Sequence, residues 1–310
     1  MSDKKKEQLI EKRFDDKDVR IELDNLSIGS DVISLAKEIL SEHIDFELLT
    51  NFDFVWLILQ KSLPATFSLL FIFIAETINI IFVGQNSAHD SIAGIGLGTL
   101  IMNATGYILC MGLLGGLDTL GSQAFGARHY YLLGLHTNIT RISVFLFFLV
   151  ICCPMFAYSY EICIAIGQSP QIALLASRFV IHMIPSLFFA IQFNTGVRYL
   201  QSQAIFTPGM YITLFTVCLH PIWCYFLITV LEMDVIGAAY AMACTQILNF
   251  LIMSVYIHFW NPCPESYFCF NRDSFDFNRI CDYLRVLYIF LIKLNFNFLA
   301  CRTFCSSIRS

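Results

Sequence analysis

The chain has 310 residues, of which 57% are hydrophobic and only 14% are charged. Soluble domains carry about 25% charged residues, so this composition excludes an ordinary soluble domain and indicates a membrane protein. The net charge of −5 is unevenly distributed, because residues 1–55 hold 22 of the 43 acidic and basic side chains. We therefore expect a solvated acidic segment, followed by a chain that lies mostly in lipid.

The acidic segment contains one stretch with helical periodicity. In SDVISLAKEILSEHI, residues 30–44, the apolar side chains recur near one face of a helix. A basic face would favour docking onto anionic lipid, but this stretch is acidic, which disfavours such docking. We expect residues 1–55 to form a cytoplasmic acidic tail with a short amphipathic helix.

Six apolar stretches after the tail are long enough to cross a bilayer, which takes about 20 mostly apolar residues. Together they predict an all-α polytopic membrane protein, with a six-helix transmembrane bundle over residues 56–260. Internal prolines at Pro185 and Pro221 are compatible with this prediction, because neighbouring helices satisfy the freed backbone groups. The six stretches are residues 63–83, 92–114, 139–160, 179–200, 209–231 and 235–259.

The last part of the chain, residues 261–310, is less regular. Its one apolar stretch, about 283–300, is interrupted by Arg285 and Lys293. We therefore expect a cytoplasmic linker here, followed by a weak seventh helix that is partial or aberrant.

The placement of arginine predicts the orientation, because cytoplasmic links carry an excess of Lys and Arg. With the tail inside, the cytoplasmic side holds Arg128, Arg141 and Arg198. The links on the outside then hold only Arg178. We expect a multi-pass protein with a cytoplasmic N-terminus, in the plasma membrane or in a vacuolar or other vesicular membrane.

Polar side chains at membrane depth are the candidates for a transport or ion pathway, since burying them in lipid is costly. Glu76 lies well inside the first span, and Asn79 follows on the same helical face. Either the pair lines a pathway that binds protons or cations, or Glu76 is a neutral acid that joins helices. Gln192 and Asn194 in the fourth span are further candidates, although two residues apart they cannot share one face.

Other polar groups in the spans leave two interpretations open. His182 is more typical of a satisfied contact between helices, whereas His220 precedes Pro221 and is either a proton switch or a partner for a freed carbonyl. Gln246 and Asn249 share one face of the sixth span and either join helices or line a cavity.

Glycine spacing in the second span predicts close helix packing. The pairs Gly94 with Gly98 and Gly112 with Gly116 follow the G-x-x-x-G pattern that lets two backbones approach. Such packing is either static or part of the rocking of a transporter.

Motifs for enzymatic chemistry are lacking in the sequence. It holds no nucleophile elbow, metalloprotease motif or phosphate-binding loop, and no basic aromatic patch for nucleic acid. The twelve cysteines are scattered without a C-x-x-C pair, as expected of small residues in a membrane core. We expect neither an enzyme nor a cofactor, a metal site or a nucleic-acid partner.

Several short segments, in order, resemble one transporter family. LDTLGSQAFGA at 117–127 is similar to the signature that follows the second helix of the multidrug and toxic compound extrusion (MATE) family, particularly its eukaryotic branch. The resemblance continues in LP at 63–64, which looks like the opening of the first helix, and in three further segments. These are FVGQ with IAGIGLGT at 82–99, RYLQSQAIFTPG at 198–209 and VIGAAYAMACTQ at 235–246.

This resemblance implies a secondary active antiporter that exports organic cations or xenobiotics in exchange for protons or sodium. It also implies a fold of two six-helix lobes that work by alternating access. Glu76 lies in the helix where some branches of the family place a coupling carboxylate. The residues that match the family motifs are Asp118, Thr119, Gln123, Phe125, Gly126, Ala127, Arg198, Gln201, Gln203 and Pro208.

The resemblance covers residues 57–260, so we expect the N-terminal lobe of such a transporter. Its partners would be the lipid bilayer, an organic cation, H⁺ or Na⁺, and a second lobe in trans. The alternatives are an inactive truncated product of a MATE gene and a polytopic receptor or adaptor. We expect the stretch at 115–134 to form a tight cytoplasmic turn between the second and third helices, apart from the transport site.

Overall fold

The computed structural model describes residues 51–86, 89–260, 263, 266, 283 and 285. The chain divides into two compact units, residues 1–63 and 64–310. Within the first unit, only the beginning of one helix is described. The predicted tail helix at 30–44 lies outside the described residues, and so does the predicted seventh helix apart from Tyr283 and Arg285.

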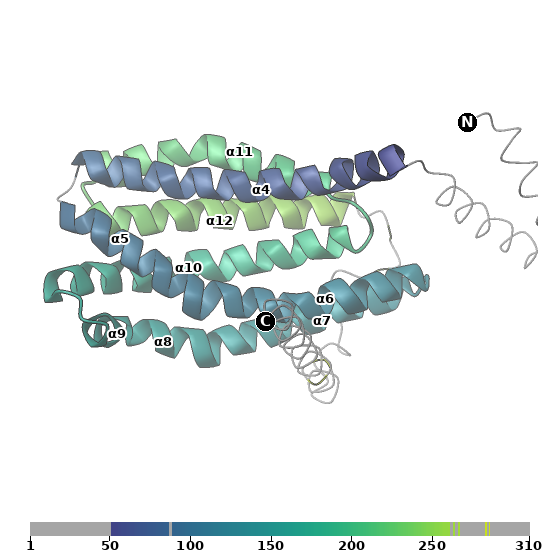
Figure 1. Cartoon of the computed structure of the whole chain (residues 1–310), viewed down its shortest axis with the longest axis horizontal. Coiled ribbons are helices and arrows are strands. Elements are labelled where there is room, and N and C mark those ends of the chain that lie inside the picture. The colour runs from purple at the N-terminus through teal and green to yellow at the C-terminus, as the bar shows by residue number, and fades with distance from the viewer. Residues whose placement is uncertain are drawn as a thin grey trace, which may run out of the picture. The chain divides into compact units, whose positions relative to one another are not determined.

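The described residues form helices joined by short links, and no strand occurs among them (Figure 1). Three of the elements are π-helices, labelled η. In chain order the elements are α4 Asn51–Asn86, α5 His89–Met102, η1 Asn103–Tyr107, α6 Ile108–Gly126, α7 Tyr130–Phe147, η2 Phe148–Cys152, α8 Cys153–Ala157, α9 Ser159–Ala165, α10 Pro170–Gln201, α11 Thr207–Cys224, η3 Tyr225–Val230 and α12 Asp234–Phe259.

The prediction of an all-α bundle with six spans is confirmed for this part of the chain. Six continuous helical stretches are long and apolar enough to cross a membrane, and each overlaps one of the predicted spans. Pro185 and Pro221 lie inside α10 and α11, as expected. The six stretches are Ile58–Gln85, Asp90–Gly126, Tyr130–Ala157, Pro170–Gln201, Thr207–Val230 and Asp234–Phe259.

The third span starts much earlier than hydropathy predicted, at Tyr130 rather than at residue 139. The added turns contain polar side chains, including Thr137 and Asn138, that are almost fully buried. They are therefore surrounded by protein, whereas a hydropathy scale scores each of them as if it faced lipid.

The expectation of a tight turn over residues 115–134 was wrong for most of that stretch. Residues 115–126 continue α6, and only three residues separate α6 from α7. Arg128, with a φ of 59°, takes the left-handed conformation that ends many helices. Pro64 also differs from expectation, because it lies inside α4 and does not open that helix. Small residues such as Gly121 are here part of a helix surface.

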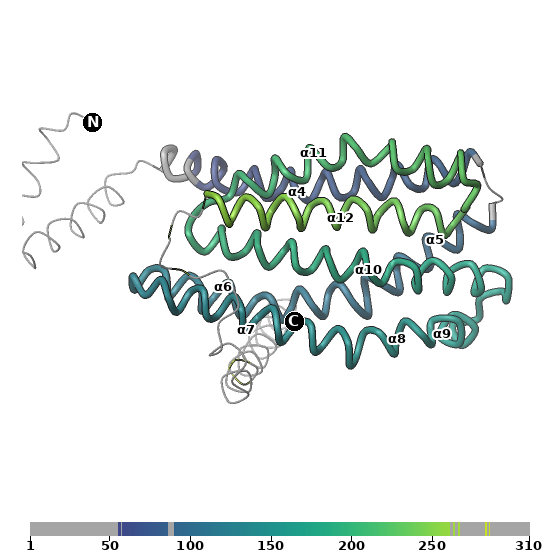
Figure 2. Tube along the Cα trace, turned by 180° about the vertical axis from the view of Figure 1, so that it is seen from behind, coloured from purple at the N-terminus to yellow at the C-terminus, as the bar shows by residue number. Residues whose placement is uncertain are grey.

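Helix α10 occupies the middle of the bundle (Figures 1 and 2). It packs along α12 on one side and along α5 and α6 on the other. Helix α4 is buried least, since only 17% of its apolar window is inside the protein, compared with 39–56% for the other spans.

The first glycine pair makes the predicted close contact. A Cβ atom at Gly94 would lie 2.7 Å from Cβ of Leu175, and one at Gly98 would lie 2.7 Å from Cδ1 of Phe179, so both glycines let α5 approach α10. The second pair does not act as a unit, because a Cβ at Gly112 would meet no atom within 4 Å.

Gly116, the other glycine of the second pair, provides space for Tyr283. A Cβ atom there would lie 2.6 Å from the Tyr283 hydroxyl oxygen. The hydroxyl donates a hydrogen bond to the carbonyl oxygen of Leu113, 2.9 Å away. Tyr283 is 3% exposed and packs with Leu135 and Ile139 of α7. This tyrosine therefore packs against both α6 and α7.

We predict that Gly94→Ala lowers the free energy of unfolding by about 1–3 kcal/mol, because the new methyl group overlaps atoms fixed to the α10 backbone. Gly96→Ala is the matched control on the same helix, since no atom lies within 4 Å of its added Cβ. That control should be neutral or stabilising by up to about 1 kcal/mol. Thermal unfolding of both variants in detergent measures the difference, and equal effects would contradict the packing described.

Candidate functional site

A cavity of about 410 Å³ lies between α4, α5, η1, α10 and α12. This volume is in the range of small-molecule sites in proteins. Its walls are mostly apolar, with polar groups that come from all five of these elements. The polar lining residues are Glu76, Asn79, Thr99, Asn103, Tyr107, Ser186, Asn194 and Gln246.

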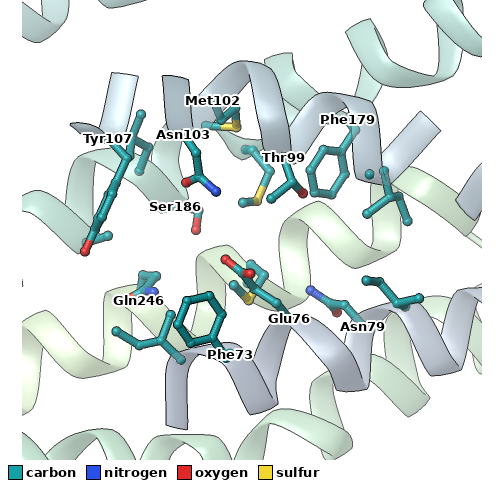
Figure 3. Close-up of a pocket in the computed structure, with 18 of the residues that line it drawn as sticks. Phe73, Glu76, Asn79, Thr99, Met102, Asn103, Tyr107, Phe179, Ser186 and Gln246 are labelled. Carbon is teal, nitrogen blue, oxygen red and sulfur yellow. The ribbon is translucent and has the colours of Figure 1, made fainter. Parts of the chain in front are cut away.

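Glu76 is the central charged group of this cavity. Figure 3 shows its carboxyl group pointing into the cavity, toward the side that carries Ser186 and Asn103. It makes no hydrogen bond and no ion pair with the residues that the structure describes. The lining contains no Lys, Arg or His. A carboxyl group without a protein counter-charge attracts cations from outside the protein.

The predicted pathway residues separate into two groups. Glu76, Asn79 and Asn194 line the cavity, whereas Gln192 does not. Gln192 is 9% exposed and lies on another face of α10, as its spacing from Asn194 required. Asn194 donates a hydrogen bond from Nδ2 to the carbonyl oxygen of Ala190, 2.8 Å away.

Thr99, Asn103 and Tyr107 also line the cavity, and sequence reasoning missed them. They follow each other at intervals of four residues, which is a polar stripe along an otherwise apolar span. Asn103 and Tyr107 are the first and last residues of η1. Short π-helices within α-helices are frequent at functional sites, and here one presents side chains to the cavity.

The structure shows the surroundings of the other polar residues in the spans. Gln246 lines the cavity, and Asn249 accepts a hydrogen bond from the Thr216 hydroxyl of α11 at 2.6 Å, so one residue of the pair lines the cavity and the other joins two helices. His182 is 2.7 Å from the carbonyl oxygen of Arg178 and packs edge-on against Tyr240. His220 of α11 is fully buried and contacts Thr245 of α12.

The two family motifs meet at one end of the bundle. The Arg198 guanidinium forms an ion pair with the Asp118 carboxylate, across 80 residues of sequence. The Ser122 hydroxyl donates to the carbonyl oxygen of Asp118, and a Cβ at Gly121 would lie 2.7 Å from Ser202 Oγ. None of the motif residues lines the cavity. The motifs therefore join α6 to the end of α10.

The remaining motif residues lie around this junction. Thr119, Gln123, Phe125 and Gly126 belong to the second half of α6, and Ala127 caps it. Gln201 ends α10, Gln203 is 6% exposed in the link that follows, and Pro208 lies in the first turn of α11.

Comparison with known proteins shows which proteins this chain resembles. A family model described as MatE matches residues 64–226. Protein DETOXIFICATION 9 of Arabidopsis thaliana is 30% identical over 206 residues, which cover 66% of this chain and 42% of the relative. The chain therefore spans less than half the length of this curated relative.

Solved structures agree with this result. The crystal structure of the eukaryotic MATE transporter AtDTX14 matches with a TM-score of 0.66 at 26% identity, over 73% of this chain and 49% of that one. A MOP superfamily transporter from Pyrococcus furiosus matches with a TM-score of 0.61 at 20% identity, over 74% of this chain and 50% of that one. The second likeness concerns the fold alone.

We predict that Asp118 and Arg198 are energetically coupled, by about 0.5–1 kcal/mol at low salt, because their side chains are 43% and 24% exposed and solvent screens the pair. Unfolding of Asp118→Asn, Arg198→Gln and the double variant gives this coupling free energy. Arg178→Gln is the control, since Arg178 is an exposed arginine of the same helix. Strictly additive effects at low salt would contradict a functional ion pair between the two side chains.

Proposed function

Since the chain belongs to the MatE family, we propose that it forms one lobe of a secondary active antiporter. The lobe would export organic cations in exchange for protons or sodium. The observation that carries this proposal is Glu76, an ionisable group in an apolar cavity with no cationic side chain in its lining.

The walls around Glu76 suit the body of an organic cation. Phe73, Tyr107 and Phe179 place aromatic rings around the cavity (Figure 3). A cation gains energy over the face of an aromatic ring, by about 0.5–2 kcal/mol depending on desolvation. The carboxylate supplies the charge and the rings supply apolar surface, which favours bulky cations over anions and neutral polar solutes.

Glu76 also provides a means of coupling. A carboxylate binds either a proton or a cation, so ions that compete for it are exchanged. Oxygen atoms of Thr99, Asn103 and Ser186 line the same cavity and are of the type that binds Na⁺ or a protonated water chain. Proton and sodium coupling therefore both remain part of this proposal.

A second six-helix lobe would complete the transporter, since alternating access requires two halves that rock around a shared site. The chain spans about half the length of the relatives that it matches. We propose that the partner lobe faces the cavity side, in a multi-pass protein of the plasma membrane or of a vacuolar or vesicular membrane. An inactive product of a MATE gene and a receptor or adaptor are the alternatives that the binding measurement below tests.

We predict that Glu76→Gln weakens binding of tetraphenylphosphonium to the chain in nanodiscs at least tenfold, since loss of the carboxylate removes the charge that attracts the cation. Glu161→Gln, at an exposed position in α9, is the control and should bind as the unmodified chain does. The cation should also protect Glu76 from dicyclohexylcarbodiimide, as measured by mass spectrometry. Binding that is equal in both variants would contradict the proposal.

The proposed orientation has its own test. A glycosylation cassette inserted between Gly167 and Gln168 should receive glycan in a eukaryotic membrane, because this link then lies on the outside. A cassette inserted between Arg128 and His129 should remain unmodified. Gel mobility before and after endoglycosidase treatment measures both insertions. Modification of the second cassette alone would show the opposite orientation.

A further inference from the structure

Helix α11 contributes no side chain to the cavity lining, yet hydrogen bonds connect it to the cavity wall. His220 Nδ1 is 2.8 Å from Thr245 Oγ1 of α12, and its Nε2 is 3.3 Å from Cys224 Sγ. The Cys224 thiol donates to Oδ1 of Asn79 in α4, 3.2 Å away. His220 and Cys224 are 0% exposed, and Asn79 is 3% exposed. These four side chains thus join three helices inside the protein.

The donors and acceptors determine the direction of these hydrogen bonds. Asn79 donates from Nδ2 to the carbonyl oxygen of Ala238, at 3.4 Å, so its Oδ1 is the acceptor for the thiol. The Cys224 sulfur then accepts from Nε2–H of His220, and Nδ1 faces the Thr245 hydroxyl, whose single proton is shared between Nδ1 and the carbonyl oxygen of Ala241. A neutral imidazole with its proton on Nε2 is the tautomer that agrees with these contacts.

The position of Asn79 gives this network a consequence for the cavity. Asn79 follows Glu76 by three residues, so the two side chains are neighbours on one face of α4. One N–H of the Asn79 carboxamide is bonded to Ala238 and its oxygen to Cys224. These two bonds fix the orientation of the carboxamide beside Glu76, whose carboxyl group makes no hydrogen bond with Asn79 or with another described residue.

We propose that His220 and Cys224 are positioning residues that keep the Asn79 carboxamide in its bonds to Ala238 and Cys224, so that it does not bond to Glu76 and this carboxyl group stays available to the transported or coupling cation. The proposal rests on the proposed function of the cavity. Without the thiol, the released carboxamide donates to Glu76 and competes with the cation. One neutral hydrogen bond of this kind changes an equilibrium by about fivefold.

A second set of bonds shows the same arrangement between α11 and α12. The Thr216 hydroxyl of α11 donates to Asn249 Oδ1 at 2.6 Å, and Asn249 Nδ2 donates to Gln246 Oε1 at 3.1 Å. This leaves the NH₂ group of Gln246 as the part of its amide that faces the cavity. Helix α11 thus orients two amides of the cavity wall, Asn79 of α4 and Gln246 of α12, although it does not line the cavity itself.

The first measurement is the affinity for tetraphenylphosphonium in nanodiscs. Cys224→Ala should weaken binding about fivefold, whereas Cys224→Ser retains a donor at this position and should bind as the unmodified chain does. His220→Leu should weaken binding in the same direction, and His220→Gln, which keeps an amide donor near the position of Nε2, should restore it. Cys163→Ala is the matched control, because Cys163 is equally buried.

Asn79→Ala separates positioning from a general structural role. Asn79 itself lines the cavity, so this variant serves as the reference background and its own affinity is measured first. In its background, Cys224→Ala should have no further effect, since no carboxamide is left to release. A purely structural role for Cys224 predicts the same loss in both backgrounds, and that result would overturn the proposal.

The second measurement does not depend on cation binding. Dicyclohexylcarbodiimide reacts with protonated carboxyl groups, and an amide donor stabilises the carboxylate. Labelling of Glu76 should therefore slow about fivefold in Cys224→Ala and remain unchanged when Asn79→Ala is also present. If the chain binds no cation but shows this labelling pattern, the proposed function fails and the positioning role stands. Labelling that is insensitive to Cys224→Ala overturns the positioning role.

Discussion

Hydrocarbon offers no hydrogen-bond partners, so every polar group at membrane depth must find one within the protein. Most described groups do so locally or across helices. Thr137 and Thr195, for instance, donate to carbonyl oxygens four residues earlier, and His220 bonds to Thr245 across two helices. Glu76 departs from this rule, since it makes no such bond with a described residue and lies at a cavity. The function proposed above follows from this departure.

The position of α10 determines where this cavity can exist. It packs closely on α5 through Gly94 and Gly98, and it runs along α12 on its other side. Helix α4, by contrast, is mostly exposed. The cavity lies where the well-packed helices meet this loosely held one. The hydrogen bonds from Asn79 of α4 to Ala238 and Cys224 therefore hold α4 more than they would hold a helix that is buried on all sides.

Hydropathy was sufficient to predict the six spans, because lipid contact imposes a composition that a single sequence displays. It failed where polar residues face protein, as in the first half of α7, and it mistook the helical residues 115–126 for a turn. Helical spacing correctly separated Gln192 from Asn194. The pairing of Asp118 with Arg198 and the contact of Asn79 with Cys224 could not be predicted, since they join residues 80 and 145 positions apart.

The π-helix η1 divides the second span into two segments with different surroundings. One residue added to an α-helix rotates everything after it by about 100°. The face of α5 that carries Gly94 and Gly98 and the face of α6 that carries Asp118 both contact α10. The π-helix between them sets how these two faces are rotated relative to each other. The wide turn at Asn103–Tyr107 therefore links the geometry of the cavity wall to that of the Asp118–Arg198 ion pair.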